Sequence, residues 1–441
     1  MPDRTQQPPI HPFGQMTLTY PEPRKLQNGI PVYCIGSERQ QLVRISVYVA
    51  GGTFDDTKPM LSLFTASLAL EACSGMTPQQ VNEAFDYYGA WKQAKFYDRH
   101  CQLTLAVPSE KLRYILPIFG NCVLHPVFPE QELELSKHML ASNLANARQQ
   151  VRNLAQEEAR RLYYGLQHPL GHTQLVLPEH IMAVGRDDLI AFHKKYYRPA
   201  NCRIVISGHC DDQVLTLLNH TFGQWDDTRH EIEAKPFIPA TQPDNLSIID
   251  KPGALQAAII MVIPAIPRQH PDYFRLRMVI TALGGYFGSR LETDLREAQG
   301  LTYGISAMLL GHTDEAHIGI ITECDTGYVQ AVIDGVKHHI GRLKTELLPQ
   351  AELSNVKQYM LGELAKTLDT PFSIAGYVAN SWLNGLYPSY FNDQVKAIAN
   401  ATAADLRVTA QRYLDTNQMQ ITLAGDKKAI TQVLHDQNRA Q

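Results

Sequence analysis

Apolar residues alternate with polar ones in some stretches and recur at helical spacing in others, which divides the chain into short strands and amphipathic helices. Lys25–Gly36 and Leu42–Gly52 are expected to form a strand pair, and the second strand places alternate valine and isoleucine side chains on one face. Pro59–Glu71 has the helical spacing and predicts a helix. Strands and helices therefore follow one another closely from the N-terminus.

The same patterns extend through the first half of the chain. Thr77 followed by proline predicts a helix start, because Thr is a good cap and Pro suits the first helical position. Further helices are expected at Pro78–Tyr88, Pro108–Leu124, Pro129–Tyr164 and Asp187–Tyr197, and further strands at Trp91–Tyr97, His100–Val107 and Asn201–Gly208. The first two of these strands should form a hairpin.

A period of 217 residues relates the two halves of the sequence. It is seen where Asp188, Leu189, Tyr196 and Gly208 recur at the same offsets as Asp405, Leu406, Tyr413 and Gly425. An internal repeat of this kind indicates two copies of one fold. Because strands alternate with helices and helices also run consecutively, we expect an α+β protein with two homologous αβ-sandwich halves of antiparallel sheet and packed helices.

The boundary between the halves is expected at a polar segment that contains three prolines, as exposed linkers often do. The predicted organisation is an N-terminal half at residues 1–228, a linker at 229–245 and a C-terminal half at 246–441. A chain of 441 residues is too long for one ordinary core, so two domains also agree with its length.

Composition narrows the class of protein. The chain is 44% hydrophobic and 19% charged, which is typical of a soluble globular protein. Its formal net charge is only −4 and it has no basic run, so we expect neither nucleic acid nor an anionic membrane surface as a partner. It has no run of about 18 apolar residues that would span a bilayer.

Seven cysteines are scattered along the chain, odd in number and without a CxxC pair. They fit buried free thiols in a reducing compartment better than a disulfide framework or a sulfur metal site. Residues 1–14 lack the charged and then apolar run of a secretion signal. We therefore expect a cytoplasmic protein, while a leader removed before the first residue would leave the periplasm open.

Candidate chemistry is concentrated in Leu283–Gly304. Its glycines free the backbone to turn, and Ser289 followed three residues later by Glu292 predicts a capping box that starts a short helix. Leu291 and Leu295 should form the buried stripe of this helix.

That helix should end at Gly300, and Leu301–Tyr303 should begin a strand. Arg296 then lies near the helix end on another face, so Arg296 and Tyr303 are expected to point into one cleft. Considered singly, Arg296 would be a solvated charge at a helix end and Tyr303 a core aromatic with its hydroxyl at the surface.

This stretch resembles the C-terminal half of the inverted-zinc metallopeptidases, the family of pitrilysin, insulin-degrading enzyme and the mitochondrial processing peptidase. The family pattern is matched by Leu283, Gly284, Gly285, Ser289, Arg290, Leu291, Leu295, Arg296, Gly300, Leu301 and Tyr303. The resemblance covers nearly the whole chain from about Lys25. It implies two related αβ halves that face each other across a peptide-holding cavity.

The resemblance also implies roles for single residues. In the family, the arginine and the tyrosine bind the substrate backbone and stabilise the oxyanion, and these roles fall here to Arg296 and Tyr303. The implied substrate-binding residues also include Gly284, Gly285 and the pair Gln93-Ala94, where active members usually have Asn-Ala.

The metal site of the active members is missing from this sequence. They carry HxxEH on a helix of the first half, with two zinc ligands and a general base, and a further glutamate downstream. Leu63, Ala66 and Ser67 stand at the three HxxEH positions here, and the downstream ligand falls at Asn143 or Leu144. None of these side chains suits zinc. We therefore expect no metal in this chain and zinc in a partner subunit.

Other sites are weaker candidates. His168 and His172 are four residues apart, but Pro169 and Gly171 break the helix that would align them, so a surface loop is expected. The glycines of 284–288 follow a helix-like run, which argues against a phosphate loop. The chain has no G-x-S-x-G nucleophile motif.

The preferred hypothesis is a metal-free subunit that acts on oligopeptides together with a homologous subunit carrying HxxEH; a homodimer is the alternative pairing. A second hypothesis is a structural or peptide-binding protein that resembles the core subunits of respiratory complexes. A third is a zinc hydrolase that uses unforeseen ligands. Both transition-state donors are present and the zinc ligands are absent, which favours the first.

Overall fold

The computed structural model describes residues 16–36, 40–166, 168–171, 177–226, 245–311 and 315–438. Contacts divide the chain into two compact units. The N-terminal unit consists of Pro21–Asp244 and Thr370–Asn380, and the C-terminal unit of Met1–Tyr20, Asn245–Asp369 and Ser381–Gln441. The predicted linker at 229–245 lies outside the described residues except for Asn245, as do residues 1–14 and His172.

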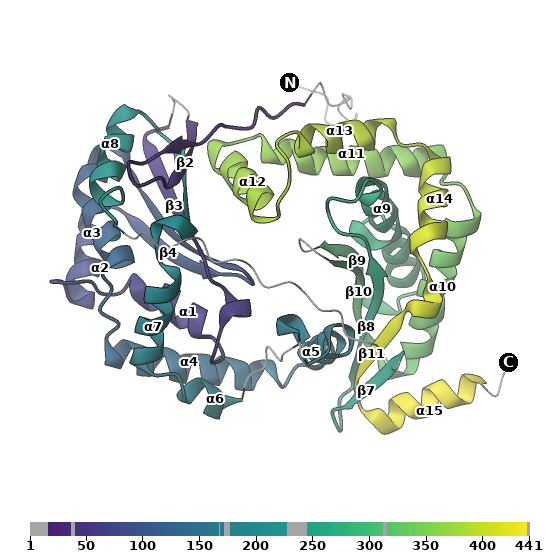
Figure 1. Ribbon diagram of the computed structural model, residues 1–441. Coiled ribbons are helices and arrows are strands. Elements are labelled where there is room, and N and C mark those ends of the chain that lie inside the picture. Colours follow the sequence, from purple (N-terminus) through teal and green to yellow (C-terminus); the bar gives the residue numbers. More distant parts are fainter. Residues whose placement is uncertain are drawn as a thin grey trace, which may run out of the picture. The chain divides into compact units, whose positions relative to one another are not determined.

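The N-terminal unit is built on a six-stranded sheet of order β1-β2-β6-β3-β5-β4 (Figure 1). Its strands are β1 (Arg24–Lys25), β2 (Pro31–Gly36), β3 (Leu42–Ala50), β4 (Trp91–Phe96), β5 (His100–Pro108) and β6 (Cys202–Gly208). β2 runs parallel to β6 and the other neighbours are antiparallel. The predicted strands and hairpin of this half are confirmed, and β4 is left at the edge of the sheet.

Helices accompany this sheet, and several of them bury apolar side chains against it. They are α1 (Leu61–Ala69), α2 (Pro78–Tyr87), α3 (Leu112–Leu124), α4 (Glu130–Ala147), α5 (Val151–Tyr164), α6 (Pro178–Met182), α7 (Arg186–Tyr196) and α8 (Asp212–Thr221). The alternating residues Val43, Ile45, Val47 and Val49 of β3 are all fully buried. They form one core with side chains from α1, α2, α3, α7 and α8, which removes apolar surface from water and is the main favourable term in folding.

Two predicted helices differ from the structure. The helix expected at Pro129–Tyr164 is two helices, because the backbone of Gln150 is extended between α4 and α5. Asn153 Nδ2 donates to the Ala147 carbonyl at 2.9 Å and so satisfies the end of α4. The helix expected from Pro108 begins at Leu112, since Pro108 still belongs to β5. Hydrophobic spacing defines neither boundary, because Gln150 is polar and a proline such as Pro108 also suits the first position of a helix.

The cap of α2 provides a test of local stability. The Gln80 amide donates to Thr77 Oγ1 at 3.3 Å, and the Thr77 amide donates to Gln80 Oε1 at 2.9 Å. Thr77→Ala should therefore lower the free energy of unfolding of the N-terminal unit by about 1 kcal/mol, while Thr77→Ser should not. Urea unfolding followed by circular dichroism measures the difference, and equal midpoints for the two variants would contradict the assignment.

The C-terminal unit repeats the strand arrangement, in the order β7-β11-β8-β10-β9. Its strands are β7 (Leu246–Asp250), β8 (Gln256–Ala265), β9 (Thr302–Gly311), β10 (Ala316–Asp325) and β11 (Gln420–Gly425). β7 runs parallel to β11 as β2 does to β6, and the remaining pairs are antiparallel. β9 occupies the edge that β4 occupies in the other sheet.

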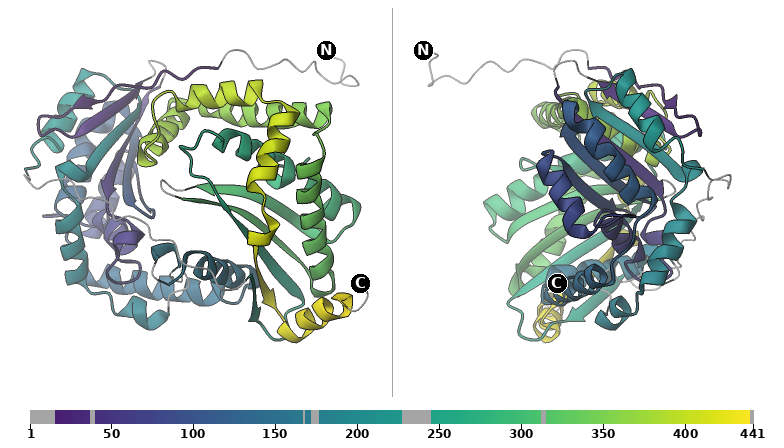
Figure 2. Two further views of the ribbon diagram at one scale, coloured as in Figure 1. Left: turned by 45° about the vertical axis from the view of Figure 1, so that its right-hand side comes forward. Right: turned by 90° about the vertical axis from the view of Figure 1, so that its left-hand side faces the viewer.

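Helices again accompany the sheet (Figure 2). They are α9 (Tyr273–Ile280), α10 (Val329–Thr345), α11 (Gln350–Thr367), α13 (Tyr390–Asn400), α14 (Ala403–Tyr413) and α15 (Lys427–Asn438), with α12 (Pro371–Leu383) divided between the units. On α10 the buried residues Val332, Val336, Ile340 and Leu343 follow helical spacing. This is an α+β fold of largely antiparallel sheets and packed helices, as expected from the sequence.

The same tyrosine-to-aspartate hydrogen bond occurs in both units. Tyr196 Oη donates to Asp55 Oδ1 at 3.2 Å, and Tyr413 Oη donates to Asp272 Oδ2 at 2.7 Å. The two tyrosines and the two aspartates are each 217 residues apart. The contact fixes a turn before the first helix of each unit to a later helix.

Neither unit is one continuous stretch of sequence. In the N-terminal unit, Arg44 Nη2 donates to the Phe372 carbonyl at 2.7 Å, and the guanidinium lies 4.9 Å from the Phe372 ring centre. In the C-terminal unit, the Leu18 amide donates to Asn392 Oδ1 at 2.9 Å and Asn392 Nδ2 donates back to the Leu18 carbonyl at 3.1 Å. Each unit is thus completed by a segment from the far part of the chain.

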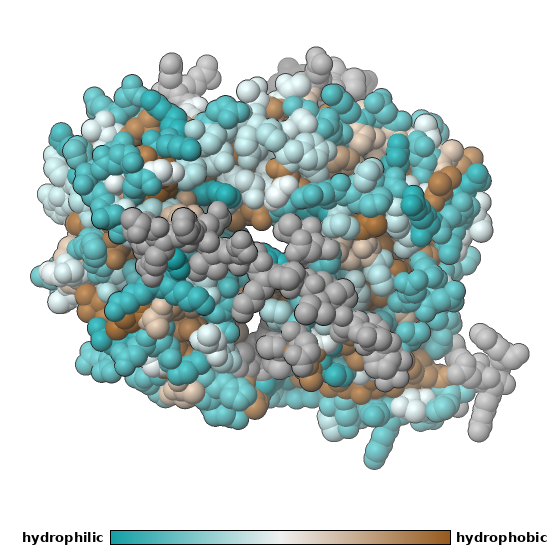
Figure 3. Space-filling model, viewed as in Figure 1, coloured by the Kyte–Doolittle hydropathy of each residue, from teal (hydrophilic) through white to brown (hydrophobic). Residues whose placement is uncertain are grey.

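No helix within the described ranges is long and apolar enough to cross a membrane. The face drawn in Figure 3 is mostly hydrophilic, with apolar side chains in small scattered groups.

Candidate functional site

The stretch singled out in the sequence forms two π-helical turns joined by a loop. α9 continues into η5 (Thr281–Gly285), and after the loop comes η6 (Glu292–Ala298). π-Helical turns are rare and frequently occur at functional sites. A Cβ added to Gly284 would lie 2.7 Å from the Ala307 amide nitrogen of β9. Glycine at this position therefore allows the turn to pack directly on the edge strand.

The predicted capping box is wrong. The Ser289 side-chain oxygen is buried and has no hydrogen-bond partner. The Glu292 carboxylate does not cap the helix. Its Oε2 lies 3.1 Å from Arg296 Nη1, and its Oε1 accepts a hydrogen bond from the Ile305 amide at 3.1 Å. A carboxylate gains more from two charge-assisted hydrogen bonds than from one capping contact.

The buried stripe of the helix is confirmed, since Leu291 and Leu295 are fully buried. Arg296 lies on another face, where its guanidinium contacts Glu292 and lies 4.5 Å from the Phe287 ring centre. Its side chain remains 32% exposed. Arg296 is therefore held in place while part of it remains accessible to a ligand.

Tyr303 lies at the start of β9, where the strand is irregular. Thr302 pairs with Cys324 and Ile305 with Thr322, so two residues oppose Glu323 alone. A bulge of this kind bends the strand and redirects a side chain. The Tyr303 residue is 93% exposed, so its hydroxyl is available, and the core position considered for it is wrong.

Two threonine hydroxyls hold the bulge together. Thr302 Oγ1 donates to the Glu323 carbonyl at 2.7 Å, and Thr322 Oγ1 donates to the Gly304 carbonyl at 2.9 Å. The Gly304 amide donates to Thr302 Oγ1 at 3.2 Å. No sequence pattern predicts the role of these threonines or that of Glu292, which ties the helix of Arg296 to the strand of Tyr303.

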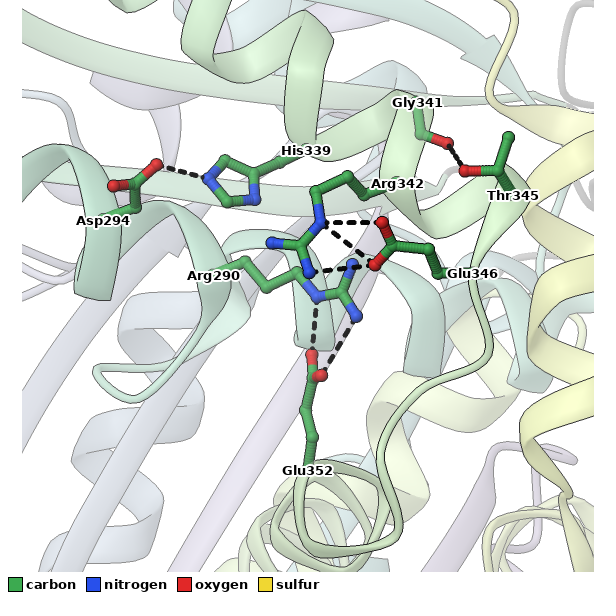
Figure 4. A network of polar contacts seen from close by, with 8 residues as sticks. All are labelled: Arg290, Asp294, His339, Gly341, Arg342, Thr345, Glu346 and Glu352. Carbon is green, nitrogen blue, oxygen red and sulfur yellow. Dashed lines mark hydrogen bonds and ion pairs between the residues drawn. The ribbon is translucent and has the colours of Figure 1, made fainter.

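Polar contacts fix the other side of the same helix (Figure 4). His339 Nε2, from α10, lies 2.7 Å from Asp294 Oδ2. Hydrogen bonds from Gln299 and His339 lower the pKa of Asp294, while burial lowers the pKa of His339. Arg290 donates to both carboxylate oxygens of Glu352, at 2.8 and 3.0 Å. The backbone that carries Arg296 is thus fixed by α10 and α11.

The positions aligned with zinc ligands lie in an apolar setting. Ala66 is buried on α1, and Leu63 and Ser67 are half-buried there. Asn143 is exposed on α4, where Leu144 instead packs against the core of the unit. Among the residues the structure describes, no three His, Cys, Asp or Glu side chains gather as a metal site. These side chains do not fit zinc, which takes nitrogen, sulfur or carboxylate ligands.

An aspartate that no sequence motif identifies lies just before α1. Asp56 Oδ1 accepts a hydrogen bond from the Ser62 amide at 2.7 Å, and Oδ2 accepts one from the Ser62 hydroxyl at 3.2 Å. Burial raises the pKa of Asp56 to about 7. A group with such a pKa is a proton acceptor near neutrality, although its two contacts are those of a helix cap.

Gln93 and Ala94 are half-buried on β4. They pair with Thr104 and Leu103 of β5, and β4 has no partner strand on its other side among the described strands. An exposed strand edge presents free backbone N–H and C=O groups that an extended peptide can pair with. The sites at Arg296 and Gln93 belong to different units, and each lies beside an edge strand.

Comparison with known proteins gives the family context. Residues 183–360 match the family model described as the peptidase M16 inactive domain. The chain is 22% identical over 349 residues to an uncharacterized zinc protease, YmxG, of Bacillus subtilis, with 78% of this chain and 83% of that protein covered. It is 22% identical over 333 residues to the non-peptidase homolog YmxG of Helicobacter pylori, with 74% and 75% covered.

Further matches extend the comparison. A probable mitochondrial-processing peptidase subunit beta of Schizosaccharomyces pombe is 22% identical over 396 residues, covering 83% of this chain and 82% of that protein. The crystal structure of a peptidase M16 inactive domain from Pseudomonas fluorescens has a TM-score of 0.84 at 22% identity, covering 92% and 98%. A chain of complex III2 from Candida albicans has a TM-score of 0.71 at 14% identity, covering 93% and 99%. Residues 183–360 therefore match the peptidase M16 inactive domain, and most of the chain is similar to proteins named as zinc proteases and to a non-peptidase homolog.

Proposed function

We propose that this chain is the metal-free subunit of a two-chain peptidase that acts on oligopeptides. A homologous subunit carrying HxxEH supplies zinc and the general base, and this chain supplies Arg296 and Tyr303. The two donors bind the peptide backbone and stabilise the oxyanion that forms at the scissile carbonyl. The active form is a heterodimer with that subunit, a homodimer is the alternative pairing, and the location is the cytoplasm.

One observation carries the proposal: the donors are accessible and fixed, whereas the metal positions are filled by apolar or neutral side chains. Glu292 anchors Arg296 and the bulge exposes Tyr303. Gly284 allows η5 to approach β9, which supports a packing role for it, and Gly285 ends the same turn. Gln93 and Ala94 on the edge strand β4 are suited to pair with an extended substrate.

The test combines purified chain with an HxxEH-bearing homologue and measures cleavage of a fluorogenic oligopeptide. Activity should require both chains. Arg296→Ala should lower kcat/KM of the mixture by about 10- to 100-fold, because a charge-assisted hydrogen bond contributes about 1.5–3 kcal/mol. Tyr303→Phe, which removes one hydroxyl, should give a smaller loss.

Two matched variants serve as controls. Arg275→Ala removes a partly exposed arginine of α9, and Tyr87→Phe alters a tyrosine of α2 that is 83% exposed. Both should leave kcat/KM unchanged. Equal activity with and without this chain, or with Arg296→Ala, would refute the shared site.

A second function is favoured by the names of two matches, a non-peptidase homolog and a chain of a respiratory complex. In that case the chain would be a structural or peptide-binding protein. Arg296→Ala and Tyr303→Phe would then change no activity, and size-exclusion chromatography would show stable assembly with the partner in their presence. A mixture that assembles but never cleaves peptides would select this alternative.

A further inference from the structure

Four of the seven cysteines lie in two contacting pairs. Cys34 hydrogen-bonds with Cys210, and Cys73 with Cys122. Cys73 and Cys122 are both fully buried, whereas Cys34 and Cys210 are both half-exposed. The molecule therefore contains an accessible thiol pair and an inaccessible one that serves as an internal comparison.

The sheet brings the accessible pair together. Gly36 at the end of β2 pairs with Gly208 at the end of β6, and Cys34 and Cys210 are each two residues from that pair. A Cβ added to Gly36 would lie 3.8 Å from Cys210 Cβ. Two separate segments thus bring Cys34 and Cys210 near each other at the ends of two paired strands.

The hydrogen bond between the two thiols affects their pKa values in opposite directions. Arg24, which is 3.0 Å from Asp212 Oδ1, also lies near the thiol pair. The hydrogen bond from Cys210 and then the Arg24 cation lower the pKa of the Cys34 thiol, while the same hydrogen bond raises that of Cys210. Cys34 is accordingly the nucleophile of the pair, since the thiolate is the reactive form.

We propose that Cys34 and Cys210 are a redox-active dithiol that closes to a disulfide on reaction with a hydroperoxide. The Cys34 thiolate attacks one peroxide oxygen, and the O–O bond breaks to give a sulfenic acid and hydroxide, which takes a proton to form water. Cys210 then attacks the Cys34 sulfur, the S–S bond forms and the S–O bond breaks. The released hydroxide takes the Cys210 proton. Two thiols are oxidised and hydrogen peroxide is reduced to two waters.

The product would link β2 covalently to the segment that leads into α8. This crosslink closes a long loop of the N-terminal unit, and such a constraint disfavours the unfolded chain. The inference is independent of the proposed peptidase function, because none of its residues takes part in that site.

The experiment treats the purified full chain with hydrogen peroxide and counts free thiols before and after denaturation, with peptide mapping under non-reducing conditions. Two of the seven thiols should disappear, and one Cys34–Cys210 disulfide should be found. Cys210→Ser should instead trap a sulfenic acid at Cys34 that dimedone labels. Cys73→Ser should form the same Cys34–Cys210 disulfide as the unmodified sequence.

A kinetic measurement tests the role of the cation. Arg24→Gln should slow alkylation of Cys34 by iodoacetamide several-fold at pH 7, with the two rates converging at high pH where the thiol is ionised in both proteins. The proposal is overturned if all seven thiols survive peroxide, if Cys73 and Cys122 are oxidised as fast, or if oxidation of Cys34 stops without forming the disulfide.

Discussion

Replacing Glu352 with alanine should lower the free energy of unfolding of the C-terminal unit by about 3–5 kcal/mol, since it leaves a buried cation without a counter-charge. Arg290 and Glu352 form a two-pronged ion pair, and their side chains are only 8% and 21% exposed. Arg290 Nη1 is already buried without a hydrogen-bond partner. Thermal and urea unfolding of the variant measure the loss.

Figure 4 contains the matched control. Arg342 and Glu346 form an equally short pair at 2.9 Å, but their side chains are 43% and 49% exposed. Glu346→Ala should cost much less stability than Glu352→Ala, because water screens an exposed pair. The double replacement Arg290→Met with Glu352→Ala should recover much of the stability that Glu352→Ala loses. Equal effects of Glu352→Ala and Glu346→Ala would show that burial does not govern this network.

Asp56→Asn should stabilise the N-terminal unit by about 4 kcal/mol at pH 8. Burial raises the pKa of Asp56 from 3.8 to about 7. Above pH 7 the carboxylate is ionised in both states, and the folded state bears the full cost of holding the charge away from water. As the pH falls from 7 to about 4, the folded state takes up the proton first and the cost disappears. The gain from asparagine should therefore vanish below about pH 4.

Urea unfolding at pH 8 and pH 4 measures this difference, with Asp86→Asn on the exposed face of α2 as the control that should change stability at neither pH. Two histidines change the pH dependence of stability in the direction opposite to Asp56. Burial lowers the pKa of both His100 and His193 to about 4, so acid favours the unfolded state below about pH 6.5. The Asp56→Asn variant should thus lose stability more steeply on acidification than the natural sequence. A constant gain at both pH values would contradict a titrating Asp56.

Much of the fold follows from the spacing of apolar residues. The spacing of apolar residues predicts β3 and α1, and it also predicts the buried stripe of Leu291 and Leu295. The same spacing does not predict the break between α4 and α5. That break depends on the Asn153 side chain, which caps a carbonyl six residues earlier. The inclusion of α12 residues in the N-terminal unit depends on a contact between Arg44 and Phe372, which no local pattern encodes.

The candidate site was only partly predictable. The family pattern identified Arg296 and Tyr303, and their roles stay a proposal. The capping box was wrong because Glu292 is close in sequence to Ser289 but closer in space to Arg296 and β9. The bulge that exposes Tyr303 arises from the pairing of β9 with β10, which a single-strand pattern cannot reveal. Asp56 has no sequence signal, because its raised pKa results mainly from burial in the folded protein.

The exchange of segments between the units has a consequence for biosynthesis. On the ribosome, all strands of the N-terminal sheet are synthesised long before Phe372. The surface around Arg44 therefore stays exposed until residues 370–380 have been translated. Nascent domains with such an unfinished surface are prone to misassembly and attract chaperones. Cutting the gene between the halves would leave each product without its borrowed segment, so co-expression rather than separate production is the route by which split halves would yield native protein.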